Sequence, residues 1–483
     1  MQHARTVATA LAGVLLLLSG WFFSGMHEPA AAGEAMAAAQ KRIFLPMAGR
    51  SLSGGAPPAT PVPQPPAAAG VFLSRMGDYH LNSSIAVDHA GGLHVAYTAS
   101  GKTPDGVDPA YYSYCAAQAV NCADAANWQR VVLGSGAGDI QLLLSSNQSP
   151  RILISPTSGS RQPVAYRYAA CNNSCGTAAN WGIASVGITN DSGFGASRRL
   201  AQSFALDAQD RPRFVYIDYG AGGAEHTGTL LAYCDSGCTN SAGWSEILID
   251  ERTIGDLALQ IDSQGLPHLL GSLLDEERES FLFYRRFDAQ HGWQQINFFR
   301  QGNGDAHWSF RLDGQDRPRI AFYQAALANG SGERLLYMAC DTNCATGEAW
   351  QIRDLGLGQG QGKFAALALD SKGQPRIAFA VAGGFGLGYT RCDNACATAQ
   401  GSWETTLLES PVQAIDRLPP VPFCRAPVWA GGEMPSLAFD RNGAPRVAYE
   451  GELTGRCLVN PNDPNDGSEQ TFTIFRGIRV IFP

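Results

Sequence analysis

The sequence has few charged residues and no cluster of lysines and arginines. Asp, Glu, Lys and Arg together make up 16% of the 483 residues, and the formal net charge is −8. Proteins that bind nucleic acid through its phosphate backbone carry a basic patch or stripe. The composition therefore argues against a nucleic-acid partner.

Familiar catalytic and metal-binding signatures are also missing from the sequence. It contains no G-x-S-x-G, no H-E-x-x-H, no Walker phosphate-binding loop and no EF-hand spacing. The acidic stretch at residues 460–469 does not match a calcium loop and is interpreted as a solvated turn. We therefore expect no metal ion and no cofactor, and the motifs identify no catalytic residue.

Only one apolar run is long enough to concern a membrane. Residues 1–23 combine a short basic start with a long apolar stretch, and the small residues Ala30-Ala31-Ala32-Gly33 follow. This order is typical of an export signal with its cleavage site, so we expect residues 1–32 to be a signal peptide and the protein to be extracellular or at the cell surface. The alternative is an uncleaved N-terminal anchor, which would then be its only contact with a membrane.

The segment after the signal is rich in Pro, Ala and Gly, most strongly at residues 51–70. Such a composition favours an extended linker over a packed domain. We therefore predict a linker at residues 33–70 and one folded domain at residues 71–483, which we expect to be a monomer.

One short phrase recurs seven times in that domain. It consists of an apolar strand, an Asp, three or four turn residues, Pro-Arg and a second apolar strand, as in LALDSKGQPRIAF from Leu367. A period of roughly 50 to 70 residues with four strand-like stretches per unit predicts an all-β fold, a seven-bladed β-propeller of four-stranded antiparallel blades. The copies begin at Asp88, Ser145, Asp207, Asp262, Asp313, Asp370 and Asp440.

The turn residues in this phrase favour a tight hairpin. Asp accepts backbone hydrogen bonds at the first position, and a Gly such as Gly373 supplies a positive φ at the fourth. Asp210, Asp316 and Gln148 replace that Gly in three copies. In the last unit we expect Phe472–Phe475 and Ile478–Phe482 to be the third and fourth strands, with residues 71–74 as a further strand.

Twelve cysteines fall into a regular pattern. Five units carry a pair between the third and fourth strands, and an even count in an exported protein predicts disulfides, with zinc as the weaker alternative because the pairs lie on different blades. Cys424 and Cys457 are expected in adjacent loops of the last unit. The predicted disulfides are Cys115–Cys122, Cys171–Cys175, Cys234–Cys238, Cys340–Cys344, Cys392–Cys396 and Cys424–Cys457.

Residues that recur in every unit are expected to serve the blade, whereas residues outside the repeat are candidates for a site. Trp308 and Trp429 lie outside the repeated Trp position, in loops that precede a first strand. Loops on a rigid scaffold commonly carry function, so this rim is the expected binding surface. The predicted binding residues there are Trp308, His307, Asp305, Arg198 and Trp429.

The phrase LALDSKGQPRIAF, together with the Tyr-Cys-Cys-Trp segment that follows it, resembles the repeats of exported bacterial β-propellers related to the sialidases. The resemblance implies a sialidase-like propeller with Asp-turn repeats. The chain departs from the sialidase Asp box, which lies between third and fourth strands and ends in Trp, and Arg198, Arg199 and Arg425 form no clear arginine triad.

Two functions are compatible with these observations. The first is a module that binds a glycan or a protein without chemistry, which we favour because no catalytic constellation is visible. The second is a sialidase-like, glycan-cleaving enzyme that uses rim carboxylates such as Asp305 or Glu433.

Overall fold

The computed structural model describes residues 69–74, 79–118, 121–157, 164–189, 202–218, 220, 228–252, 254–274, 280–300, 307–325, 332–381, 386–416, 418, 421, 424–459 and 468–483. The chain divides into two units, residues 1–43 and 44–483, and all described residues belong to the second. The predicted signal peptide and nearly all of the predicted linker lie outside them. Within these ranges no helix is both long and apolar enough to cross a membrane.

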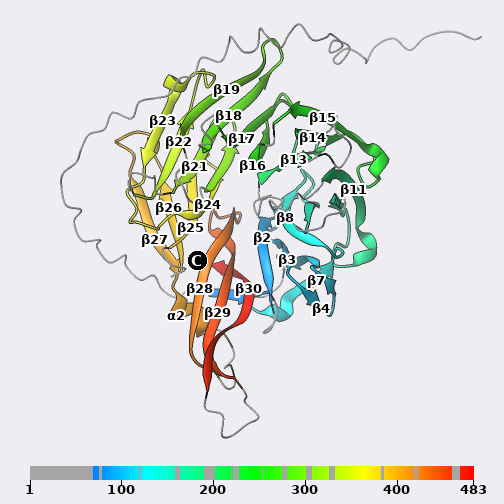
Figure 1. The fold of residues 1–483 in the computed structure, drawn as a ribbon, viewed down its shortest axis with the longest axis vertical. Coiled ribbons are helices and arrows are strands. Elements are labelled where there is room, and N and C mark those ends of the chain that lie inside the picture. The colour runs from blue at the N-terminus through cyan, green and yellow to red at the C-terminus, as the bar shows by residue number, and fades with distance from the viewer. Residues whose placement is uncertain are drawn as a thin grey trace, which may run out of the picture. The chain divides into compact units, whose positions relative to one another are not determined.

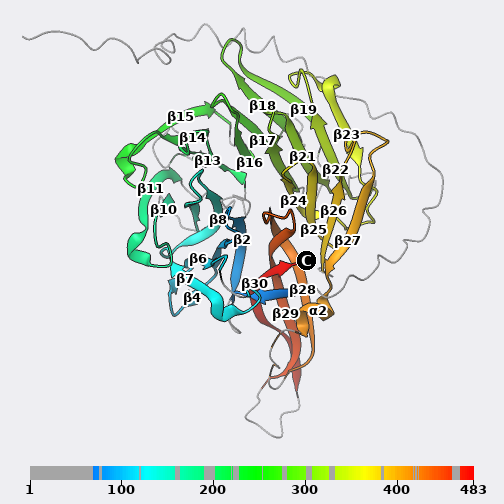
Figure 2. The same ribbon diagram turned by 180° about the vertical axis from the view of Figure 1, so that it is seen from behind.

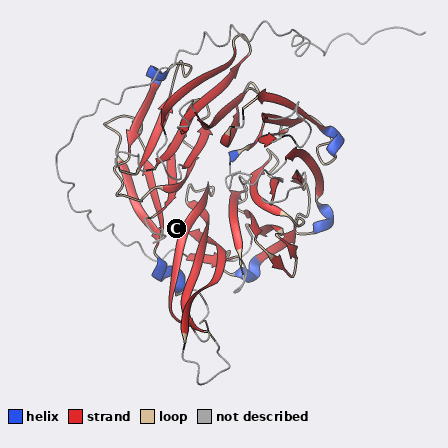
Figure 3. Cartoon of the chain, in the orientation of Figure 1, coloured by secondary structure: helices blue, strands red, loops and turns tan. Residues whose placement is uncertain are grey.

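Seven four-stranded antiparallel sheets form the described part of the chain, and we number them blades 1 to 7 in chain order. Almost everything else in these ranges is turn or loop (Figure 3). From the first strand of each blade outward, the strands are β2 (His80–Val87), β3 (Leu93–Ala99), β6 (Ala110–Cys115) and β7 (Trp128–Val132); β8 (Ala137–Leu144), β9 (Pro150–Pro156), β10 (Val164–Ala170) and β11 (Gly182–Thr189); β12 (Phe204–Leu206), β13 (Pro212–Asp218), β14 (Gly228–Cys234) and β15 (Trp244–Asp250); β16 (Gly255–Ile261), β17 (Pro267–Leu274), β18 (Ser280–Asp288) and β19 (Gly292–Arg300); β20 (His307–Leu312), β21 (Pro318–Gln324), β22 (Arg334–Cys340) and β23 (Trp350–Asp354); β24 (Lys363–Leu369), β25 (Pro375–Ala380), β26 (Leu387–Cys392) and β27 (Trp403–Glu409); and β28 (Cys424–Phe439), β29 (Pro445–Leu458), β30 (Glu469–Phe482) and β1 (Ala69–Phe72).

The remaining elements are short. They are the two-stranded sheet of β4 (Lys102–Thr103) and β5 (Gly106–Val107), the helix α2 (Pro411–Ile415), and the 3₁₀ turns Ala125–Asn127, Ala178–Asn180, Ser241–Gly243 and Gly347–Ala349.

The blades close into a ring, which confirms the predicted seven-bladed β-propeller. The first strands of neighbouring blades contact one another all the way round, from β2 to β8, β12, β16, β20, β24 and β28 and back to β2. Figures 1 and 2 show the sheets following one another in chain order. The first strands therefore surround a central channel.

The hydrophobic core lies between the blades. Each of seven clusters of buried residues joins two neighbouring blades, as Tyr284 of blade 4 does with Phe310 and Phe322 of blade 5. Both faces of each sheet are thus covered, which explains why the strands do not alternate simply between apolar and polar residues. Fully burying one such side chain stabilises the fold by roughly 1.5–3 kcal/mol.

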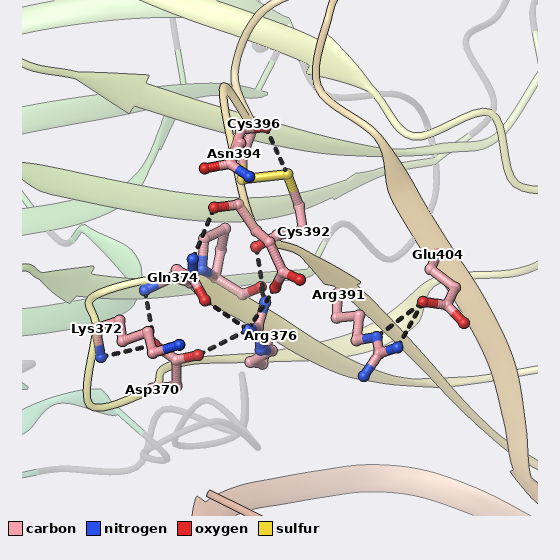
Figure 4. A network of polar contacts seen from close by, with 11 residues as sticks. Asp370, Lys372, Gln374, Arg376, Arg391, Cys392, Asn394, Cys396 and Glu404 are labelled. Atoms are coloured by element: carbon pink, nitrogen blue, oxygen red, sulfur yellow. Dashed lines mark hydrogen bonds and ion pairs between the residues drawn. A yellow bond between two sulfur atoms is a disulfide. The ribbon is translucent and has the colours of Figure 1, made fainter.

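The repeated Asp turn forms the hairpin between the first and second strands. In blade 6, Asp370 Oδ1 accepts the backbone N–H groups of Lys372 and Gln374, and Oδ2 accepts from Arg376 at 2.7 Å (Figure 4). Arg376 also donates to the backbone carbonyl of Cys392, at the start of the disulfide hairpin. The Asp and the Pro-Arg arginine therefore hold two neighbouring turns of one blade together.

The residue at the fourth turn position has a positive φ in every blade. Gly373 has φ 74°, and Asp316 adopts φ 60° in its place. Asp316 uses this position to accept hydrogen bonds from the backbone N–H and hydroxyl of Ser263 in blade 4. Asp210 binds Ser146 of blade 2 in the same way. The replacement of Gly therefore adds a contact between blades.

The disulfides join the cysteine pairs that the spacing predicts, and none of the twelve is free. In the five local hairpins the repeated Trp caps the bridge, as where Trp350 Nε1 donates to the carbonyl of Cys344 at 3.2 Å. Cys424 and Cys457 were expected in loops, and that expectation is wrong. They are directly opposite each other in β28 and β29, because both strands continue beyond the length of the other blades.

Blade 7 also differs from the prediction at its edge. Phe472–Phe475 and Ile478–Phe482 belong to one continuous strand, β30, because Arg476 and Gly477 pair with Glu452 and Gly451 of β29 instead of turning. The fourth strand comes from the N-terminal side of the domain, where β1 pairs with β30 in the register Ala69–Phe482 to Phe72–Arg479. The expected strand at residues 71–74 thus lies in this blade and begins two residues earlier.

A buried ion pair supports this closure. Arg479 of β30 donates to the carboxylate of Glu409 at the end of β27, with Nε–Oε2 at 2.6 Å, and the two side chains are 0% and 2% exposed. The guanidinium also lies 4.6 Å from the ring centroid of Phe72 in β1. Blade 6, blade 7 and the N-terminal strand therefore meet at one residue.

Candidate binding site at the channel mouth

All seven blades contribute to one pocket at the end of the channel where the first strands begin. Its empty space, counted with the open mouth, is about 650 Å³. The lining residues, blade by blade, are Asn82 and Ser83; Asp139; Gln202; Asp256, Leu257 and Ala258; His307 and Trp308; Phe364, Ala365 and Ala366; and Met434 and Pro435.

Most of these residues stand at one repeated position, six residues before the first residue of the Asp turn. The strand pairing shifts around this position in blades 1, 2, 4, 6 and 7, which marks a β-bulge. We call it the bulge position. In the described residues it is occupied by Asn82, Asp139, Asp256, His307, Phe364 and Met434.

The bulges hold several non-glycine residues in the left-handed region. Phe364 has φ 54° and Met434 has φ 44°, while Asn82 and Asp256 have similar angles. Asn and Asp tolerate this conformation, but a bulky Phe or Met adopts it at a cost of about 1–3 kcal/mol. The bulges place side chains at the channel mouth at that cost.

Below the pocket, polar side chains connect neighbouring first strands. Ser436 of blade 7 accepts the N–H of Ile85 at 3.0 Å, and Ser84 of blade 1 accepts the N–H of Leu142 at 3.0 Å. Gln141 of blade 2 bonds both the N–H and the carbonyl of Phe204 in blade 3. These bonds fix the blades around the pocket, so its walls are preformed.

Trp308 and His307 form the aromatic side of the pocket. Trp308 is partly buried and packs against the core between blades 4 and 5, with its ring 6.4 Å from that of Phe322. His307 is 3% exposed, and its ring lies 4.1 Å from that of Phe364 and 6.1 Å from that of Tyr323. Part of the indole of Trp308 remains accessible to a ligand.

The polar side is formed by Asp139, Asp256 and Ser83. Asp139 is 5% exposed, and its Oδ1 accepts the N–H of Ile140 at 2.7 Å. Ser83 is 6% exposed, and its Oγ has no hydrogen-bonding partner among the described residues. A buried hydroxyl without a partner costs about 1–3 kcal/mol unless a ligand or water supplies one.

Two glutamates lie beside the pocket on blade 7. Glu433 and Glu450 are direct partners in the pairing of β28 with β29, where two negative charges repel each other. Glu450 Oε2 accepts the N–H of Asn82 at 3.3 Å. Burial, together with the charges of Glu433 and Asp139, raises the pKa of Glu450 to about 7. Glu450 can therefore hold or release a proton near neutral pH.

The predicted site residues have different fates. His307 and Trp308 both line the pocket, while Asp305 and Arg198 lie outside the described residues. The expectation for Trp429 is wrong, because this residue is 1% exposed and packs against Phe72 at 5.2 Å as part of the blade 7 core. Asp139, Gln202 and Ser83 were missed. Counting six residues back from each turn Asp would have pointed to Asp139.

Several solved structures are similar to this chain at low sequence identity. A protein of unknown function from Dyadobacter fermentans is 11% identical, with TM-score 0.42, and the match covers 86% of this chain and 98% of that one. The NanB sialidase from Streptococcus pneumoniae is 10% identical, with TM-score 0.41 and coverage of 86% and 71%. The GH93 α-L-arabinofuranosidase of Fusarium graminearum is 8% identical, with TM-score 0.43 and coverage of 86% and 97%. No protein-family model and no curated protein matches the chain.

Proposed function

We propose that this protein binds a glycan in the pocket at the channel mouth. The observation that carries the proposal is the combination of a partly exposed indole, Trp308, with the polar groups of Asp139, Asp256 and Ser83 in one preformed pocket. Ligand pockets of this kind join aromatic surface to a few convergent polar groups.

The chemistry of a sugar matches both sides of the pocket. One face of a sugar ring carries C–H groups, which pack on an indole, and its hydroxyls donate to carboxylates and exchange hydrogen bonds with a serine. Trp308 supplies the first surface, and Asp139 and Ser83 supply the second. Because the pocket is preformed, little ordering cost opposes binding.

We further propose that the protein works outside the cytoplasm as a monomer. The six disulfides support an oxidising compartment, since such bridges do not persist in the reducing cytosol. Residues 1–32 would direct export or anchor the chain, and residues 33–70 would separate the propeller from the membrane or cell surface.

A glycan array followed by titration calorimetry tests the proposal. The variants are Trp308→Ala and Trp308→Phe, with Trp293→Phe as the matched control, because Trp293 is also partly buried but does not line the pocket. We expect Trp308→Ala to weaken binding at least about tenfold, as truncation of an aromatic anchor does.

Trp308→Phe separates binding from stability, because it retains most of the packing against Phe322. Weakened binding with an unchanged Tm supports the proposal, and Trp293→Phe should bind as the wild type does. Failure of every glycan on the array, or wild-type affinity in both Trp308 variants, would refute it.

A second candidate function is glycan cleavage, which the Glu433–Glu450 pair favours. Glycosidases use one carboxyl group that is protonated and one that is ionised, and the raised pKa of Glu450 separates the two glutamates in this way. Release of reducing sugar that disappears in both Glu433→Gln and Glu450→Gln would support this function. Binding without any turnover would leave the binding function alone.

A further inference from the structure

The pocket at the channel mouth is acidic. Asp139 and Asp256 line it, and no lysine or arginine does so among the described residues. Glu433 and Glu450 lie beside it, and the interaction of Glu450 with Asp139 shows that their fields overlap. A ligand that carries a negative charge would be repelled here, and one that carries a positive charge would be attracted.

The cationic groups nearest the pocket do not cancel this charge. Arg476 forms an ion pair with Glu452 at 2.7 Å, and Lys363, which precedes Phe364, points toward Glu333 at 4.0 Å. Arg311 lies four residues deeper along β20 and donates to the carbonyl of Phe310. It is not among the residues that line the pocket.

The unpartnered hydroxyl of Ser83 is an independent indication of a polar ligand. Its Oγ is buried at the pocket wall, where an ammonium group that donates three hydrogen bonds could use it together with the carboxylates. Trp308 across the pocket adds an aromatic face, which also attracts cations. Carboxylate, hydroxyl and indole together fit an ammonium group better than a neutral or acidic one.

We propose that the glycan bound at the channel mouth is an amino sugar with a free ammonium group, held by Asp139 and Asp256 and stacked on Trp308. This inference rests on the proposed glycan-binding function and narrows it to one substrate class. It sets the pocket apart from a site for sialic acid, whose carboxylate needs cationic side chains.

Three oligosaccharides of matched size test this inference by calorimetry at pH 6 and low salt. They are a glucosamine tetramer, an N-acetylglucosamine tetramer that lacks the charge, and a sialylated tetrasaccharide of opposite charge. We expect the glucosamine tetramer to bind at least about tenfold more tightly than the acetylated one, since hydrogen bonds to charged groups are the strong ones. We also expect that advantage to shrink with added salt.

The variants Asp139→Asn and Asp256→Asn preserve the shape of each side chain and remove its charge. Each should reduce the preference for the glucosamine tetramer and leave binding of the acetylated tetramer nearly unchanged. Glu348→Gln, an exposed change away from the pocket, is the control. The Tm of each variant checks that the propeller is intact.

The outcomes separate the two proposals. If the acetylated tetramer binds as tightly as the charged one, in a manner that depends on Trp308, the amino-sugar inference fails and the glycan function stands. Tighter binding of the sialylated sugar also overturns the inference and would point to Arg311. If oligolysine binds through Asp139 and Asp256 but no sugar does, both proposals fail and the ligand is a cationic peptide.

Discussion

Gln202 of blade 3 reaches past blade 4 and hydrogen-bonds blade 5, where its Nε2 lies 2.8 Å from Ser309 Oγ. Its Oε1 also accepts the backbone N–H of Phe310. Ser309 passes the connection to blade 6 by accepting the N–H of Leu367 at 2.9 Å. One amide therefore joins the walls of the pocket across the end of the first strand of blade 4, where Ala258 leaves room for it.

Replacing Gln202 by Ala should destabilise the propeller by about 1–3 kcal/mol, because the buried N–H of Phe310 loses its partner. Urea unfolding followed by tryptophan fluorescence measures the change. Gln351→Ala serves as the control, since Gln351 is exposed on β23 and such substitutions stay within about 0.5 kcal/mol. Equal stability of the two variants would show that the Gln202 bonds contribute nothing.

Replacing Glu409 by Ala should destabilise the protein by about 3–5 kcal/mol, because Arg479 is then left as a buried charge without its carboxylate. Glu404→Ala is the matched control in the same strand. Its ion pair with Arg391 is exposed and contributes at most about 1 kcal/mol. A small loss in Glu409→Ala would mean that water replaces the carboxylate at the junction of blades 6 and 7.

Stability should fall as pH rises through the window set by Glu450. The folded protein holds this proton up to a pKa of about 7, whereas the unfolded chain releases it near 4.5. The folded state therefore binds more protons between these values, and stability is lost as pH rises toward 7. Glu450→Gln removes the charge, so it should be more stable than the wild type by up to about 3 kcal/mol at pH 8 and nearly equal at pH 4.5.

Unfolding curves at pH 4.5 and pH 8 provide the measurement for Glu450. Glu348→Gln, an exposed substitution, should show the pH dependence of the wild type. A constant difference between Glu450→Gln and the wild type at both values would contradict the assignment of this proton to Glu450.

The disulfides should differ in their contribution according to the loop that each one closes. Cys340–Cys344 spans 4 residues and Cys424–Cys457 spans 33. Loop-closure entropy gives roughly 2 kcal/mol for the first and roughly 4 kcal/mol for the second. Thermal unfolding of the two Cys-to-Ser double variants compares them, and a larger Tm loss for the local bridge would contradict the entropic account.

Local features of this fold could be predicted from the sequence, because the residues that determine them lie within a few positions of one another. The Asp turn is an example, since Asp370, Gly373 and Arg376 carry their own hydrogen bonds within seven residues. The cysteine pairs are another, because each local pair is fixed by one hairpin. Seven copies of the turn then determine the number of blades.

Features that depend on distant residues could not be predicted. Trp429 resembles an exposed loop residue until Phe72, from the other end of the domain, covers its ring. The bulges that line the pocket leave no motif, because the bulge position carries Asn, Asp, His, Phe or Met in different blades. Only the sheet register reveals that these residues share one position.

The pairing of β1 with β30 has a consequence for the order in which the protein is made. Ala69 leaves the ribosome hundreds of residues before its partner Phe482, so the fourth strand of blade 7 waits unpaired through nearly the whole of synthesis. Blades 1 to 6 are each continuous in sequence and can form as they emerge, whereas the ring closes only after the last strand has been released. A chain interrupted in its final residues would therefore present two open sheet edges, those of blades 1 and 6, as sites for misassembly with other nascent chains.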